Sequence, residues 1–103
     1  MPQFDVFKNK APTRRLIPYL LDVQSDLLRD VSTRVVVPLF KSAEFGLASR
    51  RLNPIFEIGG TEVVMSTPEL VGVSRDVLGD RVVSLAGRRD EIVAALDFLF
   101  FGF

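Results

Sequence analysis

The sequence predicts a mostly antiparallel β-sheet that is covered by one C-terminal α-helix. Three observations indicate this fold: short β-rich runs recur along the chain, a Gly-Gly pair separates two of them, and the last residues repeat apolar side chains at helical spacing. A single domain is expected for 103 residues, and 48% hydrophobic residues can fill its core. Because a chain of this length buries only a modest fraction of its surface, forming a dimer would stabilise it by burying more.

The first two predicted strands lie near the N-terminus. Phe4–Lys8 alternates apolar and polar side chains, as a half-buried strand does. Asn9–Arg15 is expected to be a polar loop. Leu16–Val23 is the second strand, in which Pro18 indicates an edge position or a bulge, because proline cannot donate a hydrogen bond to a β-ladder.

The third predicted strand is Arg34–Phe40. Its three consecutive valines favour a strand that is buried on both faces, and Pro38 again indicates a sheet edge or a distortion. Lys41–Asn53 lacks strand alternation and carries two adjacent arginines, so we expect an exposed loop that can include one helical turn.

A β-hairpin is predicted around Gly59-Gly60. The runs Ile55–Ile58 and Thr61–Thr67 flank this pair, and both glycines can take the positive φ angles that a tight hairpin turn requires. Two weaker strands follow, with a predicted turn between them: Val71–Val73 and Arg81–Leu85, separated by Gly79-Asp80.

The last predicted element is a helix that ends at Gly102. Asp90 and Glu91 lie in its first turn, where acidic side chains interact favourably with the helix dipole. Gly102 suits the left-handed conformation that commonly ends a helix. Apolar side chains at helical spacing form one face: Ile92, Ala95, Leu96, Leu99 and Phe103.

The end of the chain is unusually aromatic, because four of its nine phenylalanines lie in the last six residues. From the helical stripe we expect Leu99, Phe100 and Phe103 to be buried, in the core or across a dimer interface. Phe101 lies off this stripe, about 100° round the helix from Phe100. An exposed aromatic residue on a rigid helix end is a candidate binding residue, and two such rings could hold an arginine between them.

Composition excludes several kinds of chemistry. The chain has no cysteine and no histidine, so it has no thiol nucleophile, no disulfide and no histidine base or ligand. Lys plus Arg and Asp plus Glu number 13 each, which argues against general binding to nucleic acid or to an anionic membrane. Asp22 and Asp26 flank a turn, where carboxylates usually cap or face solvent rather than catalyse. Without a secretory signal or a long apolar run, the chain is expected in the cytoplasm.

Four segments carry a family resemblance: Leu20–Asp26 (LLDVQSD), Arg34–Leu39 (RVVVPL), Ile55–Gly59 (IFEIG) and Phe100–Phe103 (FFGF). Together they resemble the CcdB family, and the likeness covers essentially the whole chain. The resemblance implies a homodimer with an SH3-like β-barrel and a C-terminal helix, which is not an enzyme and uses no cofactor or metal. It further implies a toxin of a type II toxin–antitoxin module that binds the A subunit of DNA gyrase and traps the cleaved-DNA complex.

The resemblance also implies roles for particular residues. The poisoning residues would be the last three, Phe101, Gly102 and Phe103, where the family commonly has tryptophan at the first position. Further gyrase contacts are implied for Leu27, Leu28, Asp97 and Arg89. A CcdA-like antitoxin, whose disordered segment folds on contact, would bind at Phe7 and Lys8 and within Lys41–Arg51, including Lys41, Arg50 and Arg51.

This chain departs from the family pattern at several positions. Phe101 replaces tryptophan, Ala86 and Arg89 stand where characterised members carry Ser and Glu, and Asp97 replaces Asn. Two alternatives therefore stay open. One is an endoribonuclease toxin of the MazF or Kid type, which shares the fold but needs acid–base residues and a basic RNA groove. The other is a degenerate, non-toxic module that only binds antitoxin.

Overall fold

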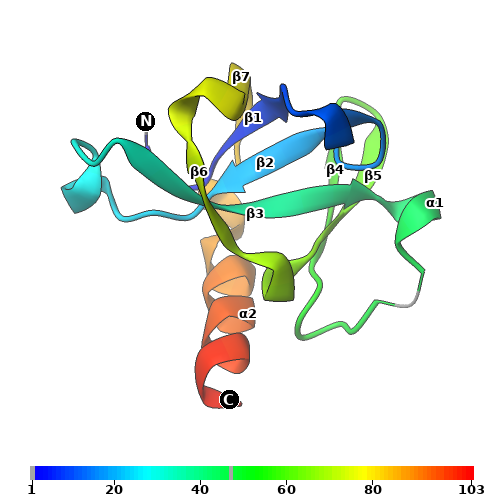
Figure 1. Cartoon of the computed structure of the whole chain (residues 1–103). Coiled ribbons are helices and arrows are strands. Elements are labelled where there is room, and N and C mark those ends of the chain that lie inside the picture. The colour runs from blue at the N-terminus through cyan, green and yellow to red at the C-terminus, as the bar shows by residue number, and fades with distance from the viewer. Residues whose placement is uncertain (1, 47) are drawn as a thin grey trace.

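The computed structural model describes residues 2–46 and 48–103, which form seven strands, one long helix and several short helical turns. Figure 1 shows how these elements are arranged. The strands are β1 (Asp5–Asn9), β2 (Tyr19–Asp22), β3 (Thr33–Lys41), β4 (Ile55–Ile58), β5 (Thr61–Met65), β6 (Val71–Ser74) and β7 (Leu78–Ser84). The helices are the single turn α1 (Ser42–Phe45) and the C-terminal α2 (Arg89–Phe101).

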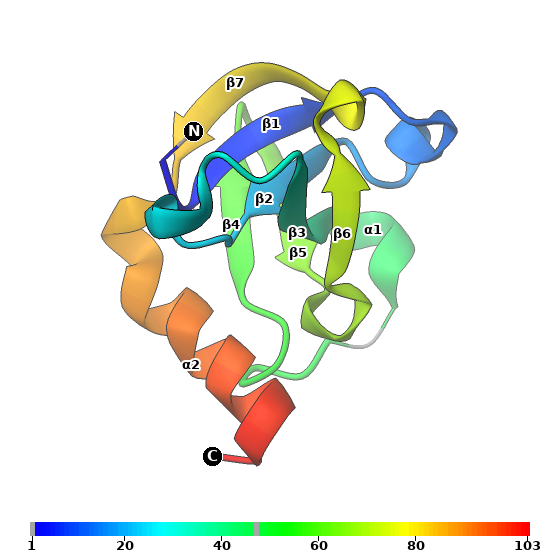
Figure 2. The ribbon, with the colours of Figure 1, turned by 60° about the vertical axis from the view of Figure 1, so that its left-hand side comes forward.

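The strands form one antiparallel sheet in the order β4-β5-β3-β2-β1-β7, and β6 pairs with β3 beside β5. The sheet curls into a half-barrel, and α2 follows β7 and runs away from the strands (Figures 1 and 2). This architecture confirms the predicted mainly β fold with a C-terminal helix, and it is consistent with an SH3-like barrel.

Neither of the two prolines that suggested sheet edges lies in or beside an edge strand. Pro18 precedes β2, which starts at Tyr19 and pairs on both sides, so the prediction of an edge or bulge there is wrong. Pro38 lies inside β3, whose pairing with β2 continues through it without a register shift. On its other side β3 pairs with β6 up to Val36 and with β5 from Leu39. Pro38 therefore lies between two partner strands, where no ladder needs its missing N–H.

The hairpin prediction is confirmed and the second turn prediction is wrong. Gly59 and Gly60 have φ angles of 58° and 81° and connect β4 to β5. Gly79 and Asp80, however, lie inside β7, and the turn before β7 is made by the 3-10 segment Arg75–Val77. A Cβ atom at Gly79 would lie 3.1 Å from Lys8, so glycine allows β7 to approach β1 closely beside an irregularity in their pairing.

The valine-rich strand β3 is buried on both faces, as predicted. Val37 belongs to the larger hydrophobic cluster, which α2 covers with the fully buried Ile92 and Ala95. Val36 points to a smaller cluster with Phe7, Leu20 and Leu78. Strands that contribute alternate side chains to two clusters explain the continuous apolar run in the sequence.

The helix α2 ends as predicted, and its fully buried residues lie in its first half, while the half-buried Leu96 also packs against the larger cluster. Gly102 is left-handed, with φ of 79°, and its N–H donates to the Phe98 carbonyl at 3.0 Å. Ala95 is the last fully buried residue of the helix. In the predicted loop Lys41–Asn53, α1 supplies the one helical turn, while Leu47 lies outside the described residues.

Candidate functional site: an exposed aromatic helix end

The C-terminal end of α2 presents three phenylalanine rings to solvent. Phe100, Phe101 and Phe103, called here the aromatic tip, are 59%, 68% and 82% exposed. The expectation that Phe100 and Phe103 are buried in the core is therefore wrong for the single chain, because the helix runs past the sheet that would cover them (Figure 1). Leu99 is half-buried. Pairing of these residues across a dimer interface stays a prediction.

The three rings form a row with Phe101 in the middle. Its ring centroid lies 6.4 Å from that of Phe100 and 6.4 Å from that of Phe103. The left-handed Gly102 turns the chain so that Phe103 comes back beside Phe101. Exposed aromatic faces attract a flat cation electrostatically, so this row can chemically receive an arginine side chain.

The other residues implied to contact gyrase are only partly brought to the aromatic tip. Asp97 is exposed and lies four residues before Phe101, on the same side of the helix. Arg89 is one helix length away, about 18 Å along the axis. Leu27 and Leu28, 93% and 51% exposed, lie in the 3-10 turn Asp26–Leu28. That turn is far from the C-terminus in both ribbon views (Figures 1 and 2), so one copy of the chain does not unite these groups.

The segment Leu20–Asp26, which carries part of the family resemblance, is instead buried over residues 20–24. Asp22 and Arg34 are both fully buried, and Asp22 Oδ2 accepts from Arg34 Nε at 2.8 Å and from Nη2 at 2.6 Å. Burial raises the pKa of the Asp22 carboxyl above its ordinary value of 3.8, and the hydrogen bond from Arg34 opposes this rise. One signal in the sequence could have indicated this pair: Arg34 stands directly before a run of apolar residues.

Neighbouring polar residues complete this buried arrangement. The Gln24 side chain accepts from the Val35 N–H at 2.8 Å and donates to the Leu28 carbonyl at 2.9 Å. Asp26, in contrast, is exposed and accepts from the Gln3 N–H at 2.7 Å. Asp22 and Asp26 therefore do not form a catalytic carboxylate pair.

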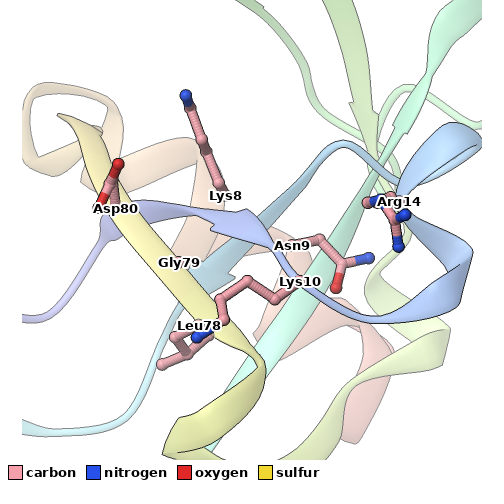
Figure 3. Close-up of a pocket in the computed structure, with 7 residues that line it drawn as sticks. All are labelled: Lys8, Asn9, Lys10, Arg14, Leu78, Gly79 and Asp80. Carbon is pink, nitrogen blue, oxygen red and sulfur yellow. The ribbon is translucent and has the colours of Figure 1, made fainter.

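The residues implied to bind antitoxin differ in their accessibility. Phe7 is only 6% exposed and packs in the smaller cluster, so its ring offers little surface to a partner. Lys8 is exposed and lines an open hollow of about 760 Å³ together with Lys10 and Arg14. Figure 3 shows these cations around the ends of β1 and β7, with Asp80 as the acidic residue of the lining.

Three further cations implied to bind antitoxin lie around α1 and the segment before β4. Lys41 is exposed and lines two smaller hollows, one on each side of α1. Arg50 is exposed and lines a hollow that Glu91 also borders. The Arg51 guanidinium lies over the Phe98 ring, 4.1 Å from its centroid. Sequence reasoning missed this contact, because it joins residues that are far apart in the chain.

Within the described residues, no group of three or more acidic side chains is placed to hold a metal ion. No helix in that part of the chain has the length and apolar character to cross a membrane.

The fold and the aromatic tip define a small, mainly β, barrel-like domain that presents an apolar helix end. A family model described as CcdB protein matches residues 3–102. The chain belongs to the CcdB family, whose members are gyrase-poisoning toxins of toxin–antitoxin modules.

Proposed function

We propose that this chain acts as a homodimer that binds the A subunit of DNA gyrase and traps the cleaved-DNA complex without catalysing a reaction itself. Phe101, Gly102 and Phe103 of the two copies would hold a gyrase arginine between their rings. The observation that carries this proposal is the exposure of Phe101, which is 68% exposed in the middle of a row of rings. Contiguous apolar side chains that are exposed on a protein surface commonly mark a site of contact with another molecule.

The distribution of the other gyrase-contact residues supports a dimer. The 3-10 turn Asp26–Leu28 lies far from the C-terminal end of α2 in both views (Figures 1 and 2), so a second copy would be needed to bring this turn and an aromatic tip together on one compact surface. The exposed Phe100 and Phe103 supply apolar area that a dimer would cover.

We further propose that a CcdA-like antitoxin neutralises this toxin by wrapping a disordered segment around the barrel. One hollow on the barrel is lined by Lys8, Lys10 and Arg14. A second hollow is lined by Arg15 and Lys41. Cationic hollows of this kind suit an acidic segment that becomes ordered on contact. This arrangement supports Lys8 and Lys41 as contact residues.

A gyrase cleavage assay tests the proposal. Folded wild-type protein at micromolar concentration should trap cleaved plasmid DNA, and a variant lacking Phe101–Phe103 should not. The deletion variant should still bind a CcdA-type peptide, because the basic hollows lie on the barrel. Absence of trapped DNA with the folded wild-type protein would overturn the proposal, whereas loss of both activities in the deletion variant would indicate misfolding.

Two further assays separate the alternatives. Specific RNA cleavage by the purified protein would favour an endoribonuclease of the MazF or Kid type, which the family match disfavours. Tight binding of a CcdA-type peptide without growth arrest on induction would favour a degenerate antitoxin-binding module. Growth arrest that a gyrase mutation rescues would favour the gyrase poison.

A further inference from the structure

A cation–π contact joins the barrel to the second half of α2. The Arg51 guanidinium carbon lies 4.1 Å from the centroid of the Phe98 ring. This is well inside the distance of about 6 Å at which a cation and an aromatic face attract each other. Figure 2 shows the segment before β4 running beside the last turns of α2.

Arg51 lies on a segment that is fixed to the barrel. The buried Asn53 donates from Nδ2 to the Met65 carbonyl at 3.0 Å and accepts from the Ser49 N–H at 3.0 Å. The Thr67 hydroxyl donates to the Leu52 carbonyl at 2.5 Å. Leu52, next to Arg51, is thus bonded to the 3-10 segment Thr67–Glu69 that follows β5, and Asn53 is bonded to β5 itself, so the backbone that carries Arg51 is fixed to the barrel.

Phe98 lies in the part of α2 that follows its last fully buried residue. The last fully buried residue of α2 is Ala95, and beyond it the side chains are half-buried or exposed. The Phe98 carbonyl accepts the capping N–H of Gly102, and Phe98 is three residues before Phe101, on a neighbouring part of the same surface. Holding Phe98 therefore holds the turn that carries the aromatic tip.

We propose that Arg51 is a positioning residue for the aromatic tip, acting by stacking on Phe98. Its consequence for gyrase poisoning rests on the function proposed above, while its effect on the helix does not. Arg51 thereby acts differently from Arg50, whose side chain is exposed beside a separate hollow. The two adjacent arginines form a matched pair for experiment, because both are charged and exposed but only Arg51 stacks on the Phe98 ring.

Amide hydrogen exchange of the full-length chain tests the positioning role. Arg51→Gln should speed exchange in the last turn of α2, at Phe98–Gly102, by about two- to five-fold, the range that an exposed cation–π contact gives. Arg50→Gln should leave this exchange unchanged. Arg51→Lys should restore part of the protection, because it keeps the cation, whereas a purely steric role would treat Gln and Lys alike.

A double-mutant cycle shows whether the effect passes through Phe98. Phe98→Leu removes the ring and keeps an apolar side chain, so Arg51→Gln should add almost nothing in the Phe98→Leu background. Equal exchange in Arg51→Gln and Arg50→Gln, or additive effects in the cycle, would overturn the proposal.

Poisoning assays with the same variants keep the two proposals distinguishable. If the chain poisons gyrase, Arg51→Gln should raise the concentration needed for cleavage trapping by about two- to five-fold. Arg50→Gln is the control, because Arg50 is not among the proposed gyrase contacts and the assay contains no antitoxin. If wild-type protein does not poison gyrase, the function proposed above fails, and the exchange experiment still decides the role of Arg51. Faster exchange with unchanged poisoning would overturn the claim that the contact serves the tip.

Discussion

The two most distinctive segments of this chain lie in opposite environments, one buried and one exposed. Leu20–Asp26 is polar at its centre, yet Asp22 is fully buried and hydrogen bonded to Arg34, and Gln24 is buried with it. Phe100–Phe103 is almost entirely aromatic, yet its three rings are more than half exposed. Each segment breaks the rule that polar groups lie outside and apolar groups inside.

Only one of these two exceptions indicates a surface that contacts other molecules. A buried polar group with its partners in place specifies the fold, because it would destabilise any other arrangement of the same strands. Exposed rings contribute nothing to the core of the single chain and are explained by what they contact outside it. A family resemblance that rests on both segments therefore rests on one feature that specifies the fold and one that is exposed to partners.

The largest effect is expected from removing the buried charge of Asp22. Asp22→Asn keeps the shape of the side chain and leaves the buried Arg34 guanidinium without its anion. We expect a loss of about 3–5 kcal/mol in the free energy of unfolding, the usual result of breaking a buried ion pair from one side. Urea denaturation followed by circular dichroism measures it.

Two controls sharpen this test. Asp26→Asn changes an exposed carboxylate in the same segment and should alter stability by less than about 0.5 kcal/mol. The double variant Asp22→Leu with Arg34→Met removes both charges and should be more stable than Asp22→Asn. Equal unfolding midpoints for Asp22→Asn and Asp26→Asn would refute the structural role of the buried pair.

The converse substitution removes the central ring of the aromatic tip. Phe101→Ala should raise the concentration needed for gyrase cleavage trapping by about 30-fold or more, the loss expected at a binding hot spot. Its free energy of unfolding should change by less than about 0.5 kcal/mol, because the ring is exposed. Cleavage titration and urea denaturation of the same preparation measure both quantities.

Val83→Ala provides the control for Phe101→Ala. Val83 is an exposed apolar residue on β7, and its truncation should leave cleavage trapping unchanged. A Phe101→Ala variant that poisons as well as wild type would show that the exposed tip is not the gyrase-binding surface. A variant that loses stability instead would show that the ring packs in a dimer.

The sequence predicts backbone conformations that depend on local residue patterns, but it does not predict contacts between strands that are distant in the chain. Gly59-Gly60 and Gly102 were read correctly, because their positive φ angles are local properties. The turn at Gly79-Asp80 was predicted wrongly, because the same residue types here serve the close approach of β7 to β1.

The candidate site divides in the same way. Exposure of Phe101 followed from helical spacing, whereas exposure of Phe100 and Phe103 could not, since no sequence pattern says where a sheet stops covering a helix. Phe7, implied as a contact by resemblance, lies in a core because β1 is buried on both faces.

A gain-of-function substitution sharpens the interpretation of the tip. Phe101→Trp restores the family's common residue, and tryptophan attracts a stacked cation more strongly than phenylalanine. We expect cleavage trapping at about two- to five-fold lower concentration, which corresponds to about 0.5–1 kcal/mol. The chain otherwise has no tryptophan, so the fluorescence of this residue reports binding directly. Weaker trapping with clear fluorescence change would indicate that the site has adapted to the smaller ring.

The smallest predicted effect compares the buried pair with an exposed one at the start of α2. Arg88 donates to both carboxylate oxygens of Glu91, at 2.5 and 2.9 Å, and this bonding lowers the pKa of Glu91 below its ordinary value of 4.5. Because the folded pKa is depressed, the pair contributes stability above 4.5 and loses it as pH falls through the folded pKa. Glu91→Gln should therefore cost about 0.3–0.5 kcal/mol at neutral pH and almost nothing once wild-type Glu91 is protonated. A difference in unfolding free energy between the two proteins that stays constant as the solution is acidified would show that the substitution acts through packing rather than charge.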